Sequence, residues 1–230
     1  MVNQNVWDIG RWAAVDRVSY DFMTRYIFEK MSSRCSFQGK RILELGCGTG
    51  RLSYLALKNG ATSVTLVDSS YKAISLARGL FIKEEADSYS IIHSDIFEFV
   101  PNEKYDLVFS AGLIEHFRED DRPRILRRHM DLSQAECIII HPTDTMYSAI
   151  FNRLPQAIKL YGFQQSYSEE EICHYITSIV QVVNYDSIRF HPFYTVPMFH
   201  NLEVANRFFD RIGCGKVFGG LTLTYVQVSS

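Results

Sequence analysis

The sequence predicts an α/β fold in which an open parallel sheet carries helices on both faces. Short apolar segments of strand length alternate with segments of helix length from residue 41 to residue 141, and this alternation is typical of βαβ units. The short segments are largely apolar, as expected of strands covered on both sides. The length supports one domain, because 230 residues without a repeat, linker or low-complexity tract are enough for a single large core.

The elements follow in order from local patterns. Residues 11–33 carry aromatic and aliphatic side chains at mixed helical spacing, which predicts one or two helices. The segment that follows predicts alternating strands and helices. Strands are expected at 41–45, 63–67, 89–93, 105–110 and 136–141, and helices at 52–59, 70–82 and 120–130.

The rhythm changes after His141. Residues 142–168 form a long stretch rich in aromatic side chains, and Ser168 with Glu171 has the spacing of a helix-opening capping box. Further on, we expect a strand at 180–190, a helix at 202–212 and an alternating strand at 221–228. We therefore divide the single domain 1–230 into a helical cap (1–38), a central half (39–141) and a lid with the C-terminal strands (142–230).

Composition excludes several classes of protein. Hydrophobic residues make up 47% of the chain, and 24 Lys and Arg against 26 Asp and Glu leave a net charge of −2. This composition excludes a disordered chain and does not demand a polyanionic partner. The five cysteines are scattered without CxxC spacing, which argues against a disulfide framework or a zinc ribbon. Because the sequence also shows no secretory signal and no run of roughly 20 apolar residues, we expect a cytoplasmic protein without membrane contact.

A glycine-rich motif lies where the first strand meets its helix. It reads Glu44-Leu-Gly46-Cys47-Gly48-Thr-Gly50, and glycines at alternate positions let the backbone turn sharply and approach a ligand. Asp68 ends the second strand, and Asp95 follows the third. The carboxyl ends of parallel strands form one rim, where ligands of such sheets bind. A carboxylate at Asp68 can accept ribose hydroxyls, and Asp95 with the next backbone N–H can recognise an adenine.

The spacing of the glycines disfavours NAD. The dinucleotide fingerprint GxGxxG requires a third glycine where this chain has Arg51. The segments ILELGCGTG, LVDSS, HSDIFEF and YDLVFSAGLIEHF instead resemble the signature of class I S-adenosylmethionine-dependent methyltransferases of the small-molecule type. The resemblance is close over residues 40–141. It extends loosely to the end, where YGFQQSYSEEEI is similar to a segment of small-molecule members.

The resemblance implies a fold, an activity and a cofactor. The fold is a Rossmann-like, doubly wound, seven-stranded and mostly parallel sheet of order 3-2-1-4-5-7-6, whose last strand is antiparallel. The activity is methyl transfer from S-adenosyl-L-methionine to an O, N or C atom, with S-adenosyl-L-homocysteine as the product. The central half, 39–141, would bind the cofactor.

The resemblance also implies residue roles. Gly46, Gly48 and Gly50, with Cys47 among them, would form the floor under the methionine part, and Glu44 would orient this loop. The ribose and adenine would be held by residues at the ends of the second and third strands. Those residues are Asp68, Ser69, Asp95 and Ile96. Ser110 and Ala111, which end the fourth strand, would pass beneath the sulfonium.

The acceptor side is less defined. His116 is the candidate general base, since it follows the fourth strand and an ordinary histidine titrates near neutrality; the alternative is that it only shapes the pocket. Glu115 and His116 would point about 100° apart on a helix, and no third ligand is evident, so no metal is expected. Substrate contacts are expected from four residues near the same rim or in the cap and lid. These are Tyr20, His141, Tyr161 and Phe163.

The aromatic lid favours a flat or apolar small molecule as the acceptor. The basic helix 120–130 leaves nucleic acid as an alternative, although a solvated helix face explains its charges equally well. The fourth strand ends in Ser-Ala-Gly-Leu, unlike the Asn/Asp-Pro-Pro-Tyr/Phe of base-amino methyltransferases. A protein methyltransferase, an NAD(P) enzyme and a non-catalytic module that keeps the fold remain open as further alternatives.

Overall fold

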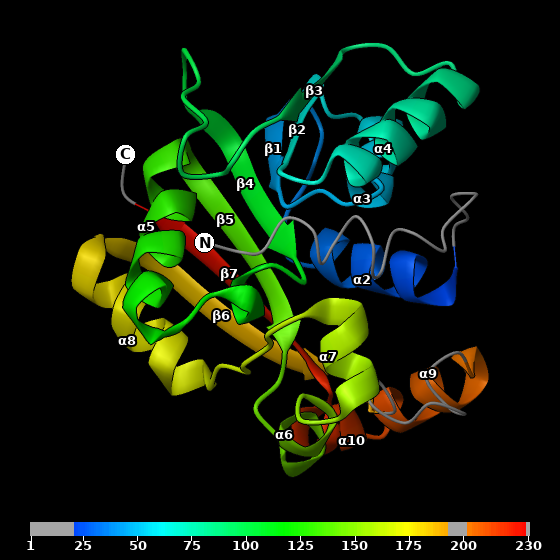
Figure 1. Ribbon diagram of the computed structural model, residues 1–230, viewed down its shortest axis with the longest axis vertical. Helices are drawn as coiled ribbons and strands as arrows, with labels where there is room; N and C mark the ends of the chain where they lie inside the picture. Colours follow the sequence, from blue (N-terminus) through cyan, green and yellow to red (C-terminus); the bar gives the residue numbers. More distant parts are fainter. Residues whose placement is uncertain (1–20, 193–201, 229–230) are drawn as a thin grey trace.

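A seven-stranded sheet forms the centre of the structure (Figure 1). The computed structural model describes residues 21–192 and 202–228. The strands are β1 (Arg41–Leu45), β2 (Ser63–Asp68), β3 (Tyr89–His93), β4 (Tyr105–Ala111), β5 (Ser133–Pro142), β6 (Val182–Phe190) and β7 (Leu221–Val228). Their order is β3-β2-β1-β4-β5-β7-β6, and β7 runs antiparallel to both of its neighbours. The predicted fold class and strand order are confirmed.

Helices lie on both faces of this sheet and at one end of it. The described α-helices are α2 (Phe22–Ser32), α3 (Arg51–Lys58), α4 (Tyr71–Lys83), α5 (Arg122–Leu132), α6 (Met146–Phe151), α7 (Pro155–Tyr161), α8 (Glu169–Ile179), α9 (Glu203–Arg211) and α10 (Cys214–Phe218). In Figure 1 the sheet passes between α5 and α8 on one side and α2, α3 and α4 on the other. Two buried clusters result, because successive strand residues point to opposite faces: Ile42 joins the cluster under α2 to α4, and Leu43 joins the cluster under α5 and α8.

Strand register brings the predicted site residues to one rim. Leu45 of β1 is paired with Val67 of β2, and Asp68 with His93 of β3. The glycine loop therefore begins beside the end of β2, and the loop that contains Asp95 begins beside Asp68. On the other side, Ala111 of β4 is paired with Ile140 of β5, which places His141 next to the end of β4.

Local caps explain where several helices begin. The Ser168 side chain accepts a hydrogen bond from the backbone N–H of Glu171 at 3.1 Å, so the predicted start of α8 is confirmed. In contrast, residues 142–168 contain two helices, α6 and α7, that the sequence does not predict. A capping box between Thr145 and Ser148 opens α6, and Pro155 lies in the first turn of α7, a position that suits proline.

The remaining differences concern the ends of the chain. Residues 1–20, which include Tyr20, lie outside the described residues, so α2 is the described helix of the cap. The short helix α10 was not expected, and it begins after Gly213 at a φ of 86°. Among the helices of residues 21–192 and 202–228, none combines the length and the apolar composition needed to cross a bilayer.

Candidate active site

The glycine loop between β1 and α3 has a backbone that few other residues could adopt. Gly46, Gly48 and Gly50 have φ angles of 65°, 53° and 71°, in the left-handed region that disfavours side chains. A Cβ atom at Gly46 would lie 2.7 Å from Cδ1 of Leu113. The loop is attached to β2, since the backbone N–H groups of Gly46 and Cys47 both donate to the Val67 carbonyl, at 2.8 and 3.1 Å.

Asp68 connects this loop to the end of β2. Its Oδ2 accepts a hydrogen bond from the Gly48 backbone at 2.8 Å, and its Oδ1 accepts one from the Ser70 backbone at 2.8 Å. The carboxylate therefore lies against the glycine loop, at the rim where ligands of open α/β sheets bind. The neighbouring Ser69 is bonded through its carbonyl to Nε2 of His93, at 3.0 Å.

Asp95 lies at the adjacent corner of the rim. Its Oδ1 accepts a hydrogen bond from the Phe97 backbone at 2.8 Å, which makes a tight turn after β3. The next residue, Ile96, is buried, and its carbonyl accepts a hydrogen bond from Nε of Arg128 at 2.8 Å. Arg128 also donates to the Phe99 carbonyl, so an arginine of α5 holds this loop in place.

Glu44 and Cys47 act beneath the loop. Glu44 is buried, and its Oε2 accepts hydrogen bonds from Oγ and N of Ser53, at 2.6 and 3.3 Å. It thus ties β1 to the first turns of α3, and burial raises the pKa of Glu44 to about 8. Burial also raises the pKa of the Cys47 thiol well above its usual value. Such a thiol is unreactive and packs as a small apolar group.

The end of β4 is oriented by α5. Ser110 is fully buried, and its Oγ lies 2.9 Å from Nε2 of His129. His129 is bonded through Nδ1 to the Ile125 carbonyl at 2.8 Å, and burial lowers the pKa of His129 to about 4. The Ser110 side chain therefore faces helix α5. The backbone after Ala111 continues to Gly112, whose N–H donates to the Ile140 carbonyl at 2.9 Å.

The turn that follows β4 brings together two titratable side chains. Glu115 and His116 lie in a 3-10 turn (Ile114–His116), and both are buried. Nδ1 of His116 lies 2.8 Å from the Phe163 carbonyl. A carbonyl only accepts hydrogen bonds, so Nδ1 carries the proton, and Nε2 of neutral His116 is left with the lone pair.

Glu115 lies beside that lone pair. Its Oε1 is 3.9 Å from Nε2 of His116, and its buried Oε2 has no hydrogen-bond partner among the described residues. Burial raises the pKa of Glu115 to about 8. Although these two side chains are closer than helical geometry predicted, no group of three potential metal ligands occurs in the described part of the chain.

The lid segment 161–167 is bonded to this turn at three alternate residues, Phe163, Gln165 and Tyr167. The Gln165 backbone donates to the Glu115 carbonyl at 2.8 Å, and the Tyr167 hydroxyl donates to the Ile114 carbonyl at 3.2 Å. With the contact between His116 and Phe163, these bonds make the turn and the lid one unit. Sequence reasoning did not identify Tyr167 as a site residue, although it lies inside the segment that carries the resemblance.

The predicted substrate contacts are placed unequally around this unit. Phe163 is half exposed, with the Arg118 guanidinium 5.1 Å from the centre of its ring, while the Tyr161 ring lies 6.2 Å from that of Phe151. His141 is fully buried with its ring 5.9 Å from that of Tyr167. Its Nδ1 is bonded to the Pro142 carbonyl at 2.9 Å, and burial lowers the pKa of His141 to about 4. Tyr20 falls outside the described residues.

Comparison with known protein families concerns the same part of the chain. The sequence model of a family described as "Methyltransferase domain" matches residues 42–134, which include the glycine loop, both rim acids and the turn with His116. Residues 42–134 therefore match a methyltransferase domain. The family match and the geometry therefore concern the same residues.

Relatives of this methyltransferase domain act on different acceptors. A malonyl-[acyl-carrier protein] O-methyltransferase of Priestia megaterium is 34% identical over 96 residues, 41% of this chain and 34% of its own length. A tRNA U34 carboxymethyltransferase of Pseudomonas aeruginosa is 30% identical over 105 residues, 44% of this chain and 32% of its own length. The chain thus spans about a third of the length of these curated relatives.

A solved structure extends the likeness in fold to most of the chain. The magnesium protoporphyrin IX methyltransferase of Synechocystis PCC 6803, with bound S-adenosylhomocysteine, has a TM-score of 0.63. The alignment covers 90% of this chain and 82% of that protein, at 13% sequence identity. At this identity the comparison concerns the fold alone.

The basic helix α5 agrees only in part with its prediction. Arg124 and Arg127 are exposed, as a solvated face predicts. Arg122, in contrast, is 4% exposed, with its guanidinium 4.3 Å from the centre of the Tyr167 ring and in an ion pair with Glu171. His129 is also buried, and Arg128 holds the loop after β3. The signal was present in the sequence, because Arg122 and His129 share a helical face with the buried Ile125.

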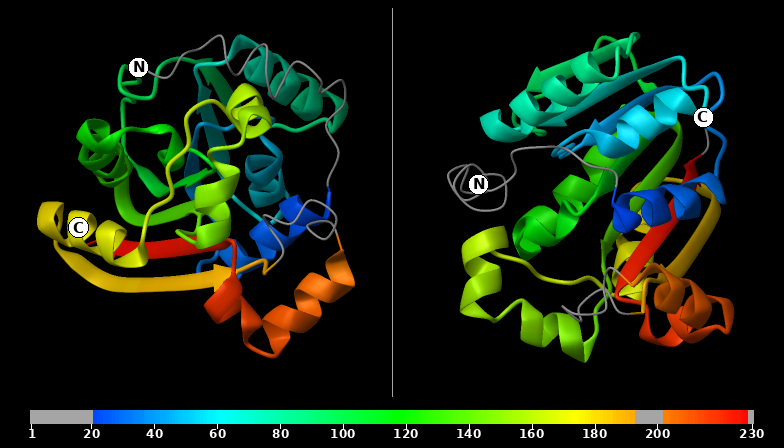
Figure 2. Two further views of the ribbon diagram at one scale, coloured as in Figure 1. Left: turned by 60° about the horizontal axis from the view of Figure 1, so that its bottom comes forward. Right: turned by 90° about the vertical axis from the view of Figure 1, so that its right-hand side faces the viewer.

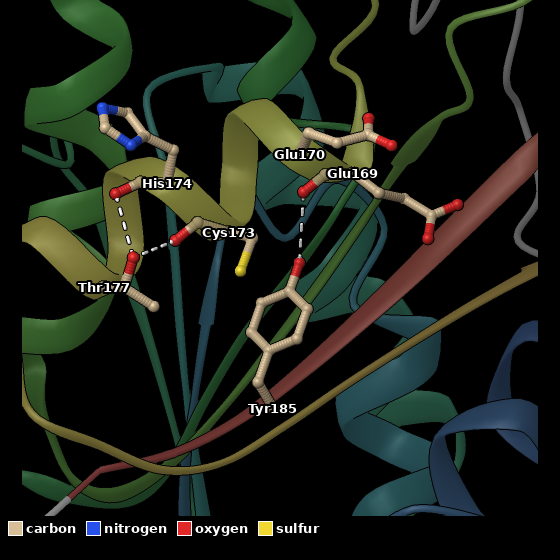
Figure 3. Close-up of a pocket in the computed structure, with 6 residues that line it drawn as sticks. All are labelled: Glu169, Glu170, Cys173, His174, Thr177 and Tyr185. Carbon is tan, nitrogen blue, oxygen red and sulfur yellow. Dashed lines mark hydrogen bonds between the residues drawn. The ribbon is translucent and has the colours of Figure 1, made fainter.

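A separate cavity lies between helix α8 and strand β6. It measures about 430 Å³ and is lined by Glu169, Glu170, Cys173, His174, Thr177 and Tyr185 (Figure 3). The Tyr185 hydroxyl donates to the Glu169 carbonyl at 3.4 Å, and Oγ1 of Thr177 donates to the Cys173 carbonyl at 2.7 Å. The lining includes none of the predicted site residues, so we do not assign this cavity to the active site.

Proposed function

We propose that this chain transfers a methyl group from S-adenosyl-L-methionine to an O, N or C atom of a small apolar or aromatic metabolite. The observation that carries the proposal is the Asp68 carboxylate, held against three glycines of positive φ at the carboxyl rim of a parallel sheet. This arrangement suits a ribose above a close backbone approach.

The rim residues fit the cofactor. A carboxylate has about four lone-pair sites, so the bonds that Asp68 accepts from Gly48 and Ser70 do not exhaust it, and ribose hydroxyls can share it. Asp95 accepts its bond from Phe97 at Oδ1, which leaves Oδ2 for an adenine amino group. When bound, S-adenosyl-L-methionine supplies a methyl group on a positively charged sulfur, so that the sulfide departs neutral.

His116 is the residue that we assign to proton removal. Its Nε2 lone pair, fixed by the bond between Nδ1 and the Phe163 carbonyl, can accept the proton of a hydroxyl, amine or acidic carbon. The resulting positive charge would favour ionisation of Glu115, 3.9 Å away, because an opposite charge stabilises a carboxylate. The bonds from Gln165 and Tyr167 keep this turn in place under the lid.

The surroundings favour a small metabolite over a nucleic acid. Arg122 and Arg128 of the basic helix are used in internal contacts, so they cannot form a phosphate-binding stripe. The turn that holds the proposed base is instead bonded to aromatic residues of the lid, through the Phe163 carbonyl and the Tyr167 hydroxyl. A cytoplasmic location agrees with the five cysteines, all of which are free thiols.

Transfer of labelled methyl groups tests the proposal. The chain would be incubated with methyl-labelled S-adenosyl-L-methionine and a cell extract, which is then separated into small-molecule, RNA and protein fractions. We expect label in the small-molecule fraction. His116→Gln should reduce the transfer by about 10²–10⁴-fold and leave the affinity for S-adenosyl-L-homocysteine unchanged.

Each other outcome selects an alternative. Label in the RNA fraction would support a nucleic-acid methyltransferase, as some relatives of the chain are, and label in the protein fraction would support a protein methyltransferase. Binding of S-adenosyl-L-homocysteine without transfer to any fraction would support the non-catalytic module. Without such binding, the proposal fails altogether.

A further inference from the structure

Helix α9 is packed with its polar face inward. Arg207 donates from Nη1 and Nη2 to the two carboxylate oxygens of Glu29 in α2, both at 2.7 Å. Asp210 forms an ion pair with Lys30 at 3.3 Å and accepts a hydrogen bond from the Tyr26 hydroxyl. The charged side of α9 is therefore the side attached to the domain.

The apolar face of α9 points away from the domain. Val204, Phe208 and Ile212 are spaced four residues apart, and they are 83%, 56% and 58% exposed. Residues four apart lie on one side of a helix. Phe218, at the end of the adjoining α10, is 63% exposed. Soluble domains usually bury such a face, so its outward direction marks it as a candidate contact surface.

Helices α6 and α7 also expose apolar side chains. Met146 and Ile150 of α6, Leu154 at the N-cap of α7 and Ile158 within α7 are all exposed, whereas the polar Ser148 is buried and donates to the Thr143 carbonyl at 2.8 Å. In Figure 1 and in the right-hand view of Figure 2, α6, α7, α9 and α10 lie at the same end of the molecule. We call the exposed apolar residues of these helices and their caps the apolar end. They are Met146, Ile150, Leu154, Ile158, Val204, Phe208, Ile212 and Phe218.

Basic residues accompany the apolar end. Arg153, Lys159, Arg211 and Lys216 are exposed and form no ion pair with any residue that the structure describes. Residues 143–165 and 202–220 together hold five Lys or Arg against three Asp or Glu, a net charge of +2, although the whole chain carries −2. Two of those three acids, Glu203 and Asp210, are paired with residues of α2. The outward charge of this end is consequently positive.

Although the sequence alone predicts no membrane contact, we propose that the apolar end is a docking surface for anionic lipid membranes. Amphipathic helices with Lys and Arg beside an apolar face lie in the membrane interface, where the apolar side chains enter the acyl boundary and the cations face the headgroups. A second copy of the chain is a poorer occupant, since a two-fold contact would bring the same positive charges together.

Vesicle co-sedimentation of the full chain tests this proposal. We expect binding to phosphatidylcholine vesicles that contain phosphatidylglycerol, little binding to phosphatidylcholine alone, and loss of binding as salt increases. Arg211→Gln with Lys216→Gln should weaken binding by roughly 30-fold, because each cation near the surface contributes about fivefold. Val204→Ser with Phe208→Ser should weaken it by more than about tenfold.

Matched variants control for general effects on the surface. Val100 is 83% exposed, as Val204 is, and Ile82 is 70% exposed, so Val100→Ser with Ile82→Ser should leave vesicle binding unchanged. Circular dichroism would show that every variant is folded. The proposal is overturned if the wild-type chain does not bind anionic vesicles, or if the control pair reduces binding as much as the α9 pair. It is also overturned if the wild-type chain self-associates without binding vesicles, and Val204→Ser with Phe208→Ser abolishes that self-association.

Discussion

Replacing Gly46 with alanine should damage the glycine loop in two separable ways. The φ of 65° costs about 1–2 kcal/mol for any residue with a Cβ. The new Cβ would also lie 2.7 Å from Cδ1 of Leu113, and the repacking that this forces costs about 1–3 kcal/mol. We therefore expect the free energy of unfolding to fall by about 2–5 kcal/mol. The affinity for S-adenosyl-L-homocysteine should fall as well, because Leu113 lies just before the turn with His116.

Two other glycines separate these contributions. Gly39 has a φ of 76°, and a Cβ added there would meet nothing within 4 Å, so Gly39→Ala should cost only the backbone part, about 1–2 kcal/mol. Gly79 lies inside α4 with an ordinary φ and open space, so Gly79→Ala should stabilise the fold by about 0.5–1 kcal/mol. Urea denaturation followed by circular dichroism would measure all three.

The steric part can be tested directly by shortening Leu113. In the Leu113→Ala background, Gly46→Ala should lose its contact cost, which gives a coupling energy of about 1–3 kcal/mol between the two sites. Three results together would refute the reasoning. Gly46→Ala would lower the free energy of unfolding no more than Gly39→Ala does, and the effects of Gly46→Ala and Leu113→Ala would add without coupling. Titration calorimetry would also find that Gly46→Ala leaves the affinity for S-adenosyl-L-homocysteine unchanged.

Two further predictions concern the turn after β4. Tyr167→Phe removes the bond to the Ile114 carbonyl, so thermal denaturation should show a loss of about 0.5–1.5 kcal/mol and single-turnover assays a slower transfer at unchanged cofactor affinity; an unchanged rate would contradict the anchoring role. Burial raises the pKa of Glu115 and of Glu44 from 4.5 to about 8. Between pH 4.5 and about 8, both side chains are protonated in the folded protein and ionised in the unfolded chain. The free energy of unfolding should therefore fall as pH rises through this range, and Glu115→Gln should remove about half of that slope. A slope that is the same in Glu115→Gln and in the wild type would contradict this account.

Much of the fold could be predicted because its strands are short and apolar and its helices recur between them. Segments such as 41–45 and 63–67 agree with β1 and β2 to within one residue. The helices α6, α7 and α10 could not be predicted, since they have six, seven and five residues, too few to show an apolar period. Their apolar side chains also point outward, against the pattern on which such predictions depend.

The positions of the candidate site residues could be predicted where polar side chains follow strand ends. Asp68 and Asp95 lie at the same rim, as strand order predicts, and their contacts with a cofactor stay a prediction. The roles of Arg122 and Arg128 were missed, because charge suggests solvent, whereas the structure uses their long side chains for stacking and for binding carbonyl groups. Contacts such as that between His116 and the Phe163 carbonyl join residues 47 positions apart, and local sequence patterns carry no information about them.

Binding of S-adenosyl-L-homocysteine to the wild-type chain and to Asp68→Ala is the most direct test of the central claim. Asp68→Ala should remove charge-assisted bonds to the ribose, each worth about 1.5–3 kcal/mol, and titration calorimetry should show a loss of affinity of more than about tenfold. Asp87→Ala, an exposed acid before β3, should bind as the wild type does. Absence of binding to the wild type, displacement of the ligand by NAD, or a smaller loss in Asp68→Ala would contradict the account.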